Sequence, residues 1–365
     1  MADSVNSPIV ADALKRLVEK QNLSREEAQT VMEEIMSGSA HDVQIAAFLT
    51  ALRMKGETVE ELIGFAQVLR GRAAAIWAHR PVTSALAGTG REMLVDTCGT
   101  GGDASNTFNV STATAFVVAG TGLRVAKHGN RSVSSLCGSA DVVEALGVNI
   151  QIAPWLVARC IDEVGIGFLF APLLHQAMKA VMLARREMRI RTVFNMLGPL
   201  TNPAGASSQV LGVYSEHLTE TLASVLKELG TRRAFVVHGA DHLDEISNTG
   251  PSRISEVHDG SIRTYEVTPQ DFGVPRASIE ELRGGSVREN ADITLNILRS
   301  EKGPRRDIVL MNAAAAAMAG KRASTFKEGV RLSADSIDSG AALRKLEELI
   351  AFSNSFSQGA VEPRP

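Results

Sequence analysis

Residues 93–120 read MLVDTCGTGGDASNTFNVSTATAFVVAG. An apolar β-type run at 93–96 leads into a loop with three glycines, and Asn109-Val-Ser-Thr112 then opens an apolar helical run. A strand, a glycine-rich loop and a helix in this order are typical of an α/β sheet. Glycine permits the positive φ angles that turn several backbone N–H groups toward one point, next to a helix N-terminus. The stretch predicts a phosphate-binding concavity, although a tight strand-to-helix turn would need the same glycines.

The composition is that of an ordinary globular protein of two or three folding units. The chain has 365 residues, of which 44% are hydrophobic and 22% charged, and its formal net charge is −3. This charge and an aromatic content of 4% argue against a nucleic-acid surface. The sequence has no signal-like leader and no apolar run of about 18 residues, so we expect no membrane attachment. Its three cysteines fit neither a disulfide framework nor a zinc site, which predicts a reduced, cytoplasmic protein.

Two patterns divide the chain. Residues 1–80 carry apolar residues at three- and four-residue spacing, with capping boxes at 24–27 and 58–61, and predict a small all-helical N-terminal domain to which part of 175–205 contributes. From 90 to 355, β-type and helical runs alternate, which predicts a larger α/β domain with a central, mostly parallel sheet flanked by helices. The predicted strands are 93–96, 124–127, 167–171, 209–214 and 234–239, and the predicted helices of this domain are 110–119, 139–146, 175–188 and 216–229.

A second polar loop follows the next predicted strand. Lys127-His-Gly-Asn-Arg131 ends that strand and leads into a serine cluster before another helix. In open α/β sheets, ligands bind outside the carboxyl ends of the strands, so the two loops predict one shared site. Lys127 and Arg131 would also suit a solvated turn, but their position beside a glycine and several serines favours anion binding.

A third polar segment follows the predicted strand at 234–239. Asp241, Asp244 and Glu245 come soon after it. Adjacent carboxylates repel one another unless a cation lies between them, and Mg²⁺ commonly bridges a few carboxylates and phosphate oxygens. A solvated acidic loop, or an acidic helix N-terminus, is the commoner explanation for such acids taken alone. In combination with two phosphate-type loops, the acids favour a magnesium site.

Cations gather in a fourth segment, after Phe168-Leu-Phe-Ala-Pro-Leu-Leu-His175. Helical spacing puts Lys179 and Arg186 on one side of the predicted helix and Arg185 and Arg189 on another, so they cannot all face one ligand. An inward arginine would recognise a planar carboxylate through two parallel hydrogen bonds. His175 is as consistent with a core or loop histidine as with a site residue.

Together these motifs resemble the anthranilate phosphoribosyltransferase family, and the resemblance covers nearly the whole chain. The motifs that carry it are Gly-Thr-Gly-Gly-Asp (99–103), Asn-Val-Ser-Thr (109–112), Lys-His-Gly-Asn-Arg (127–131), Gly-Ser-Ala-Asp (138–141), Thr-Val-Phe-Asn-Met-Leu-Gly-Pro-Leu-Thr-Asn-Pro (192–203) and Leu-Asp-Glu (243–245). The resemblance implies the class III phosphoribosyltransferase fold, shared with pyrimidine nucleoside phosphorylases, and a homodimer formed through the helical domain. It also implies transfer of the phosphoribosyl group of phosphoribosyl pyrophosphate (PRPP) to the amine of anthranilate in tryptophan biosynthesis, with anthranilate synthase as a candidate partner.

The resemblance assigns roles to residues of this sequence. It implies a catalytic set of Lys127, His128 and Arg185, with Arg185 facing the anthranilate carboxylate. A magnesium ion would be held by Ser111, Asp244 and Glu245. The implied substrate-binding residues are Gly99, Gly102, Asp103, Thr107, Asn109, Val110, Ser111, Thr112, Lys127, His128, Gly129, Asn130, Arg131, Ser132, Val133, Ser134, Ser135, Ser139, Pro172, His175 and Arg185.

The chemistry of such a transfer agrees with these residue types. Displacement of pyrophosphate builds positive charge on the ribose ring and negative charge on the leaving group, which calls for a magnesium ion, amide donors and Lys127. The arylamine is already neutral at physiological pH, so it needs no strong base, and its alignment with the ribose carbon supplies much of the rate advantage. We therefore expect no covalent protein nucleophile and a structural role for Cys98.

The sequence departs from the family pattern at four positions. Leu136 and Cys137 stand where Lys or Arg and then Ser are usual, Gln176 where Pro is usual, and His242 where Gly is usual. Two other functions are alternatives: a pyrimidine nucleoside phosphorylase on the same fold, and a non-enzymatic relative that binds nucleic acid. The acid pair at 244–245 argues against the first, and the negative net charge against the second.

Overall fold

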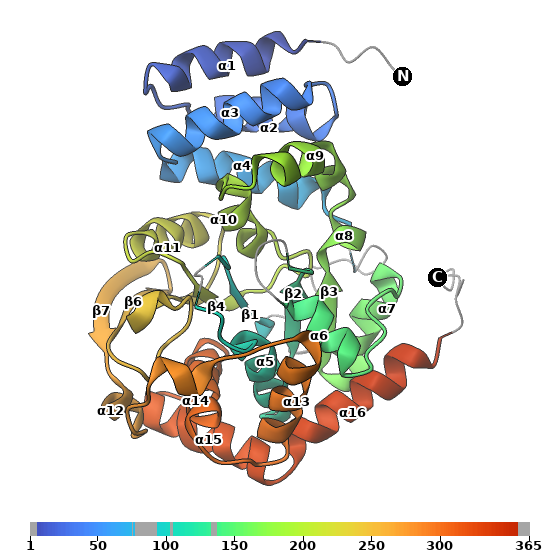
Figure 1. Ribbon diagram of the computed structural model, residues 1–365, viewed down its shortest axis with the longest axis vertical. Helices are drawn as coiled ribbons and strands as arrows, with labels where there is room; N and C mark the ends of the chain where they lie inside the picture. Colours follow the sequence, from blue (N-terminus) through green and yellow to red (C-terminus); the bar gives the residue numbers. More distant parts are fainter. Residues whose placement is uncertain (1–5, 75, 77–92, 103–104, 133–136, 357–365) are drawn as a thin grey trace.

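The computed structural model describes residues 6–74, 76, 93–102, 105–132 and 137–356. It contains a helical part at the N-terminus, blue in Figure 1, and a larger part built around one sheet. None of the helices in these ranges is long and apolar enough to cross a membrane. The residues singled out from the sequence that lie outside the described ranges are Asp103, Val133, Ser134, Ser135 and Leu136.

Four helices form the N-terminal part: α1 Pro8–Val18, α2 Arg25–Met36, α3 Asp42–Lys55 and α4 Val59–Arg72. Both predicted capping boxes are confirmed, because the side chains of Ser24 and Thr58 each accept an N–H from the first turn of the helix that follows. Two later helices, α9 Lys179–Met188 and α10 Val193–Leu200, pack against this part (Figure 1). α9 contacts α2 and α3, and α10 contacts α3 and α4.

A seven-stranded sheet forms the centre of the larger part, in the order β3-β2-β1-β4-β5-β6-β7. The strands are β1 Val95–Gly99, β2 Val125–Gly129, β3 Ile166–Phe170, β4 Ser208–Gly212, β5 Arg233–Gly239, β6 Ser252–His258 and β7 Ser261–Val267. Strands β1 to β5 run parallel, while β6 and β7 are antiparallel to their neighbours, so the expected mostly parallel sheet is confirmed. The five predicted strands overlap β1 to β5, and the β6–β7 hairpin has no counterpart among them.

Helices cover both faces of this sheet. They are α5 Val110–Gly120, α6 Ser139–Ala145, α7 Pro154–Arg159, α8 Ala171–Leu174, α11 Leu218–Glu228, α12 Pro269–Phe272, α13 Val287–Leu298, α14 Pro304–Ala319, α15 Phe326–Asp338 and α16 Ala341–Asn354, with a π-helical turn at Cys160–Val164 and 3₁₀ turns at Gln176–Met178, Ala240–His242 and Ile279–Leu282. Along β5, Phe235 and Val237 enter one core with α5 and α14, and Ala234 and Val236 enter the other with α4 and α11. Burial on both faces explains why β3 and the middle of β5 are continuous apolar runs.

The predicted helices agree with the structure except at one end. Those at 110–119, 139–146 and 216–229 are confirmed as α5, α6 and α11. The helix predicted over 175–188 is wrong at its start, because His175 has φ −120° and ψ 62° and a 3₁₀ turn precedes α9. The backbone therefore bends at His175, between the end of β3 and the helix that packs on the N-terminal part.

Candidate active site

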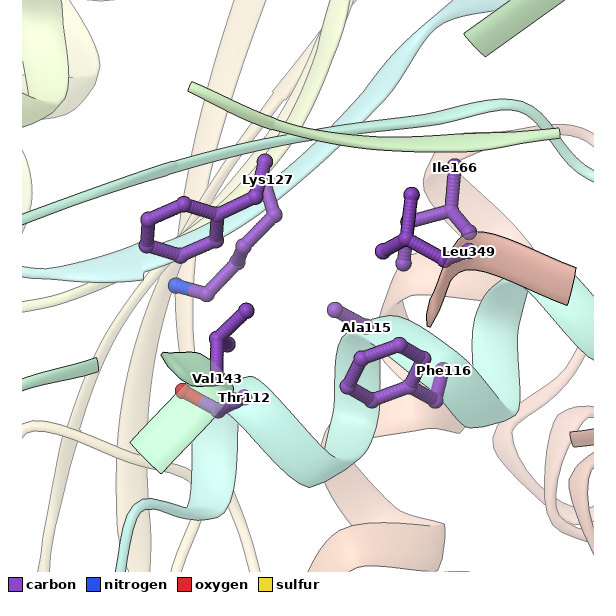
Figure 2. Close-up of a pocket in the computed structure, with 8 residues that line it drawn as sticks. Thr112, Ala115, Phe116, Lys127, Val143, Ile166 and Leu349 are labelled. Carbon is purple, nitrogen blue, oxygen red and sulfur yellow. The ribbon is translucent and has the colours of Figure 1, made fainter. Parts of the chain in front are cut away.

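A cavity of about 630 Å³ lies where the helical part meets the carboxyl ends of β1 and β2. All four segments singled out from the sequence contribute to its walls. The predicted site residues that line it are Gly99, Gly102, Thr107, Asn109, Val110, Ser111, Lys127, His128, Gly129, Asn130, Arg131, Ser132, Ser139, Pro172, His175, Arg185, Asp244 and Glu245. Thr112 is placed differently: its fully buried side chain lines a separate void of about 10 Å³, shown in Figure 2.

The cavity also has an apolar wall that none of the predicted site residues supplies. It is lined by Leu69 of α4, Met178 just before α9, Met182 within α9, and Phe194 and Leu197 of α10. Their helical spacing is that of core residues, so only the fold reveals that they face a cavity. Phe194 and Leu197 do lie within the motif at 192–203, which was the available signal.

The glycine loop after β1 has the backbone conformation that its sequence predicts. Gly101 and Gly102 have φ angles of 65° and 74°, a region that L side chains rarely adopt. The N–H of Gly101 donates to Oδ2 of Asp244 at 2.9 Å. A Cβ on Gly99 would lie 2.3 Å from the same oxygen, so a side chain there would displace the Asp244 carboxylate. The glycine loop and the acidic segment are therefore in direct contact.

The loop leads to the N-terminus of α5, whose unpaired N–H groups favour a bound anion. Asn109 occupies the N-cap position. Its Nδ2 donates to the Cys137 carbonyl at 3.3 Å, and its Oδ1 accepts from Nδ2 of Asn290 at 3.1 Å. The residue ahead of the helix is thus fixed by two segments that are distant in sequence.

Lys127 is a buried cation beside this helix, with only 3% of its surface exposed. Its ammonium donates to the Thr97 carbonyl and, at 3.3 Å, to Oγ of Ser111. Figure 2 shows the ammonium directed away from the apolar side chains of Ile166 and Leu349. Because Lys127 also lines the main cavity and is held by neutral oxygens, its charge is available to an anion bound there.

Asp96 lies fully buried beneath these groups, on β1. It accepts the N–H of His128 at 3.2 Å and Nδ2 of Asn202 at 2.8 Å. Burial raises the pKa of the Asp96 carboxyl, and the positive charge of Lys127 opposes that rise. Asp96 and Asn202 thus support the loop after β2, although neither was predicted as a site residue. An acidic residue in the otherwise apolar run at 93–96 was the sequence signal from which Asp96 could have been predicted.

His128 and His175 lie together in the cavity wall, with their ring centroids 5.2 Å apart. Burial lowers the pKa of His128 to about 3 and that of His175 to about 4, so both rings are neutral at physiological pH. Within the described ranges, Nε2 of each ring is buried without a hydrogen-bond partner. Because such atoms are rare in folded proteins, both are candidates to bind a ligand.

Arg185 is the arginine of the fourth segment that lines the cavity. Its guanidinium carbon lies 5.3 Å from the centroid of the Phe194 ring, and burial lowers its pKa. In the part of the chain that the structure describes, this guanidinium has no hydrogen-bond or ion-pair partner. Arg186 is exposed and pairs with Glu187 at 3.2 Å, and Arg189 is exposed at the end of α9. A half-buried arginine without an acceptor is suited to a carboxylate ligand.

Arg131 lines the cavity, but its charge is shared with acids of α6. Its Nη1 lies 2.8 Å from a carboxylate oxygen of Asp141 and 2.8 Å from one of Glu144. Hydrogen bonds to these carboxylates raise the pKa of Arg131, so the side chain is firmly anchored. An anion in the cavity would compete with both acids for this guanidinium.

Asp244 and Glu245 line the cavity, whereas Asp241 does not. Asp241 and His242 have φ angles of 58° and 63°, and the Asp241 carboxylate accepts from the Thr249 hydroxyl at 2.6 Å. Among the residues described, no three His, Cys, Asp or Glu side chains gather into a metal site. The acid pair and the Ser111 hydroxyl, which lines the same cavity, would make a hard, oxygen-only donor set. It fits Mg²⁺, because that ion keeps several waters and takes further oxygens from phosphates.

Cys98 also reaches the cavity wall, but its thiol is not activated. Burial raises its pKa well above the ordinary value, and Nε2 of Gln209 donates to Sγ at 3.0 Å. A protonated, hydrogen-bonded thiol is a poor nucleophile. The arrangement agrees with a structural role for Cys98.

Family models match both parts of the chain. One described as "Glycosyl transferase family, a/b domain" matches residues 91–343, and one described as "Glycosyl transferase family, helical bundle domain" matches residues 11–73. The two-part fold with a cavity between the parts is thus that of a glycosyl transferase.

Comparison with individual relatives shows which family of glycosyl transferases the chain resembles. An anthranilate phosphoribosyltransferase from Pelotomaculum thermopropionicum is 54% identical over 356 residues, which cover 98% of this chain and all of the relative. The crystal structure of the Thermus thermophilus anthranilate phosphoribosyltransferase is 42% identical with a TM-score of 0.86, covering 94% of this chain and 99% of that one. The Saccharomyces cerevisiae enzyme in complex with PRPP and Mg is 28% identical with a TM-score of 0.84, and with 4-fluoroanthranilate 27% and 0.82, each covering 95% and 98%. The chain belongs to the anthranilate phosphoribosyltransferase family.

Proposed function

We propose that this protein transfers the 5-phosphoribosyl group of PRPP to the amine of anthranilate, giving N-(5-phosphoribosyl)anthranilate and pyrophosphate. The observation that carries the proposal is that one cavity contains binding groups for two different anions. Arg185, which has no partner in the described ranges, lines the cavity beside an apolar wall. Lys127, the glycine loop and the acid pair line the same cavity. These groups complement an aromatic carboxylate and a polyanionic sugar. The complexes of the yeast relative, one with PRPP and Mg and one with 4-fluoroanthranilate, support this pairing.

The phosphates of PRPP would be bound by the amides of the glycine loop, the N-terminus of α5 and Lys127. As pyrophosphate leaves, negative charge grows on its oxygens, and donors already fixed in place stabilise that charge without reorganising. Lys127 is suited to this role because a buried ammonium interacts more strongly with an anion than an exposed one does. Asp244, Glu245 and Ser111 would hold a magnesium ion, which when bound neutralises charge on the departing pyrophosphate.

Anthranilate would lie against Phe194 with its carboxylate on Arg185. The guanidinium can bind both carboxylate oxygens at once, which fixes the plane of the aromatic ring.

His128 would contact the amine of the substrate. Burial lowers the pKa of His128, and a backbone hydrogen bond to Gly198 opposes this in part, as a carbonyl acceptor does. Among the described residues, Nε2 is the ring atom without a partner. Nε2 is then an acceptor that would hold an N–H of the substrate amine. With a pKa of about 3, His128 orients this amine rather than removing a proton before attack.

We further propose a homodimer formed through the helical part. Val43 and Met54 of α3 are each 80% exposed, and Leu183 of α9, which contacts α3, is 45% exposed. Apolar side chains gathered on neighbouring helices are typical of a surface that another chain covers. Light scattering is expected to give a dimer for the wild-type protein and a monomer for Val43→Glu combined with Met54→Glu. A variant that stays dimeric would place the interface elsewhere.

The division at 1–80 and 90–355 belongs to the same proposal, with α9 and α10 supplying the part of 175–205 that joins the helical domain. A cytoplasmic location is favoured by three free, buried cysteines. Contact with an anthranilate synthase stays a prediction of the resemblance.

The experiment that tests the function follows the fluorescence of anthranilate. With PRPP and magnesium present, the purified protein is expected to consume anthranilate, so the anthranilate fluorescence falls. Omission of either PRPP or magnesium is expected to stop this fall. Thymidine or uridine with phosphate serves as the matched control for the phosphorylase alternative, and no free base is expected. Folded protein that leaves anthranilate unchanged would refute the proposal.

A further inference from the structure

Arg191 connects the segment between α9 and α10 to the glycine loop. Its Nη1 donates to the Gly102 carbonyl at 2.7 Å, and its guanidinium carbon lies 4.4 Å from the centroid of the Tyr214 ring. A Cβ on Gly102 would lie 3.2 Å from Cδ of Arg191, so the side chain packs closely on this glycine. Arg191 itself is not among the residues that line the cavity. It therefore acts on the loop from outside.

Successive residues of the glycine loop are tied to different neighbours. The side chain of Thr100 accepts the N–H of Tyr214 at 3.1 Å, and the N–H of Gly101 donates to Asp244 at 2.9 Å. The Gly102 carbonyl is held by Arg191. Because Gly101 and Gly102 have no side chains to restrict rotation, these bonds are what select one orientation of the peptide groups.

Tyr214 extends this connection into the helical part. Burial raises the pKa of the Tyr214 hydroxyl and the positive charge of Arg53 on α3 opposes that rise, so Arg53 is a near neighbour, and the Tyr214 ring supports the guanidinium of Arg191. Helices α9 and α10 flank Arg191; in Figure 1, α9 lies at the level of the N-terminal helices and α10 lies between these helices and the sheet. The position of the loop is thus coupled to the contact between the two parts of the molecule.

We propose that Arg191 is a positioning residue for PRPP, an inference that rests on the proposed function. It holds the Gly102 carbonyl toward a group outside the cavity, which keeps this oxygen from facing the phosphates. Without Arg191 the carbonyl is free to turn inward, where a partial negative charge repels an anion. Arg185, which would bind anthranilate, lies on α9 rather than in the segment that follows it, and makes none of these contacts.

Calorimetric titration with PRPP and magnesium, together with steady-state kinetics, tests this inference. Arg191→Ala is expected to weaken PRPP binding and raise the PRPP KM about tenfold, the effect of losing one charged hydrogen bond, and to leave the anthranilate KM within about twofold. Arg191→Lys keeps the charge but loses the planar contact with Tyr214, so an intermediate loss is expected. Arg186→Ala, which removes an exposed positive charge from α9, is the matched control and is expected to bind PRPP as the wild-type protein does.

The outcomes separate this inference from the proposed function. Wild-type protein that takes up no PRPP would remove the proposed function and this inference with it. Wild-type binding combined with equal binding by Arg191→Ala would overturn the inference alone, as would an equal rise in both KM values or an equal loss in Arg186→Ala. Thermal unfolding checks that each variant is folded. If Arg191→Ala does not fold, Arg191→Lys decides, and a wild-type affinity of this variant for PRPP would overturn the inference.

Discussion

The carboxylate of Asp244 accepts a hydrogen bond from the Gly101 N–H at 2.9 Å, so a proposed magnesium ligand and the glycine loop are in direct contact. The acid pair would otherwise concentrate negative charge in a cavity proposed to receive PRPP. Contact with the amide offsets part of that charge, and a bound cation would offset more of it. The acid pair and the loop are therefore expected to respond together when either is changed.

Replacement of the acid pair tests this. Asp244→Asn combined with Glu245→Gln keeps side-chain oxygens, including an acceptor for Gly101, but removes both negative charges. We expect the magnesium concentration for half-maximal turnover to rise by more than about tenfold, since affinity for hard cations follows the charge of the ligands. A magnesium titration of the fluorescence assay measures this. Asp241→Asn, outside the cavity, is the control, and a titration curve unchanged in the double variant would remove the site from 244–245.

Arg185→Ala is expected to act on one substrate. The anthranilate carboxylate would lose its charged hydrogen bonds, so the anthranilate KM is expected to rise by about 10- to 100-fold with little change for PRPP. Arg185→Lys is not expected to restore the wild-type value, because an ammonium cannot bind both oxygens in one plane. Equal rises in the two KM values would contradict the assignment, and Arg186→Ala again supplies the control.

The neutral histidines predict a pH dependence of stability. The pKa of His175 is lowered to about 4 in the folded protein, below the ordinary value of about 6.5, so the unfolded chain binds a proton first. The resulting stability is complete above about pH 6.5 and is lost as the pH falls toward 4, by on the order of 3 kcal/mol. Denaturant unfolding at pH 7 and pH 4.5 measures the loss. His175→Asn is expected to reduce it, and an equal loss in this variant would show that the ring is not the cause.

The strand-end loops could be predicted because the physical signals are local. Glycines that need positive φ, cations such as Arg131 and acids such as Asp244 each follow a buried strand, and parallel strands bring their carboxyl ends to one edge. The β6–β7 hairpin lacked such a signal. Polar residues such as Ser252 and Ser255 are buried in β6, so its sequence has no clear alternation of apolar and polar positions.

The finer assignments required the fold. Helical spacing separates Arg185 from Arg186, but it does not say which of the two faces packs near Phe194. Three acids follow β5, and the backbone turn at Asp241, not its residue type, removes that acid from the cavity. Thr112 belongs to a phosphate-type motif, yet the rotation of α5 places it in a small void under the site.

The left-handed backbone at His242 yields the last prediction. The resemblance implies glycine there, and the φ of 63° favours glycine, since a side chain in this region costs about 1–2 kcal/mol. His242→Gly removes that cost but makes the unfolded chain more flexible, so we expect its stability to be unchanged or slightly higher. His242→Ile is expected to lower stability by about 1 kcal/mol or more, because β-branched residues tolerate this region least. His258→Ile, at an exposed strand position with negative φ, is the control and is expected to be nearly neutral in denaturant unfolding. If the isoleucine is tolerated equally at both positions, the conformation at 242 carries no strain, and the turn that sets Asp244 beside Gly101 must be fixed by other contacts.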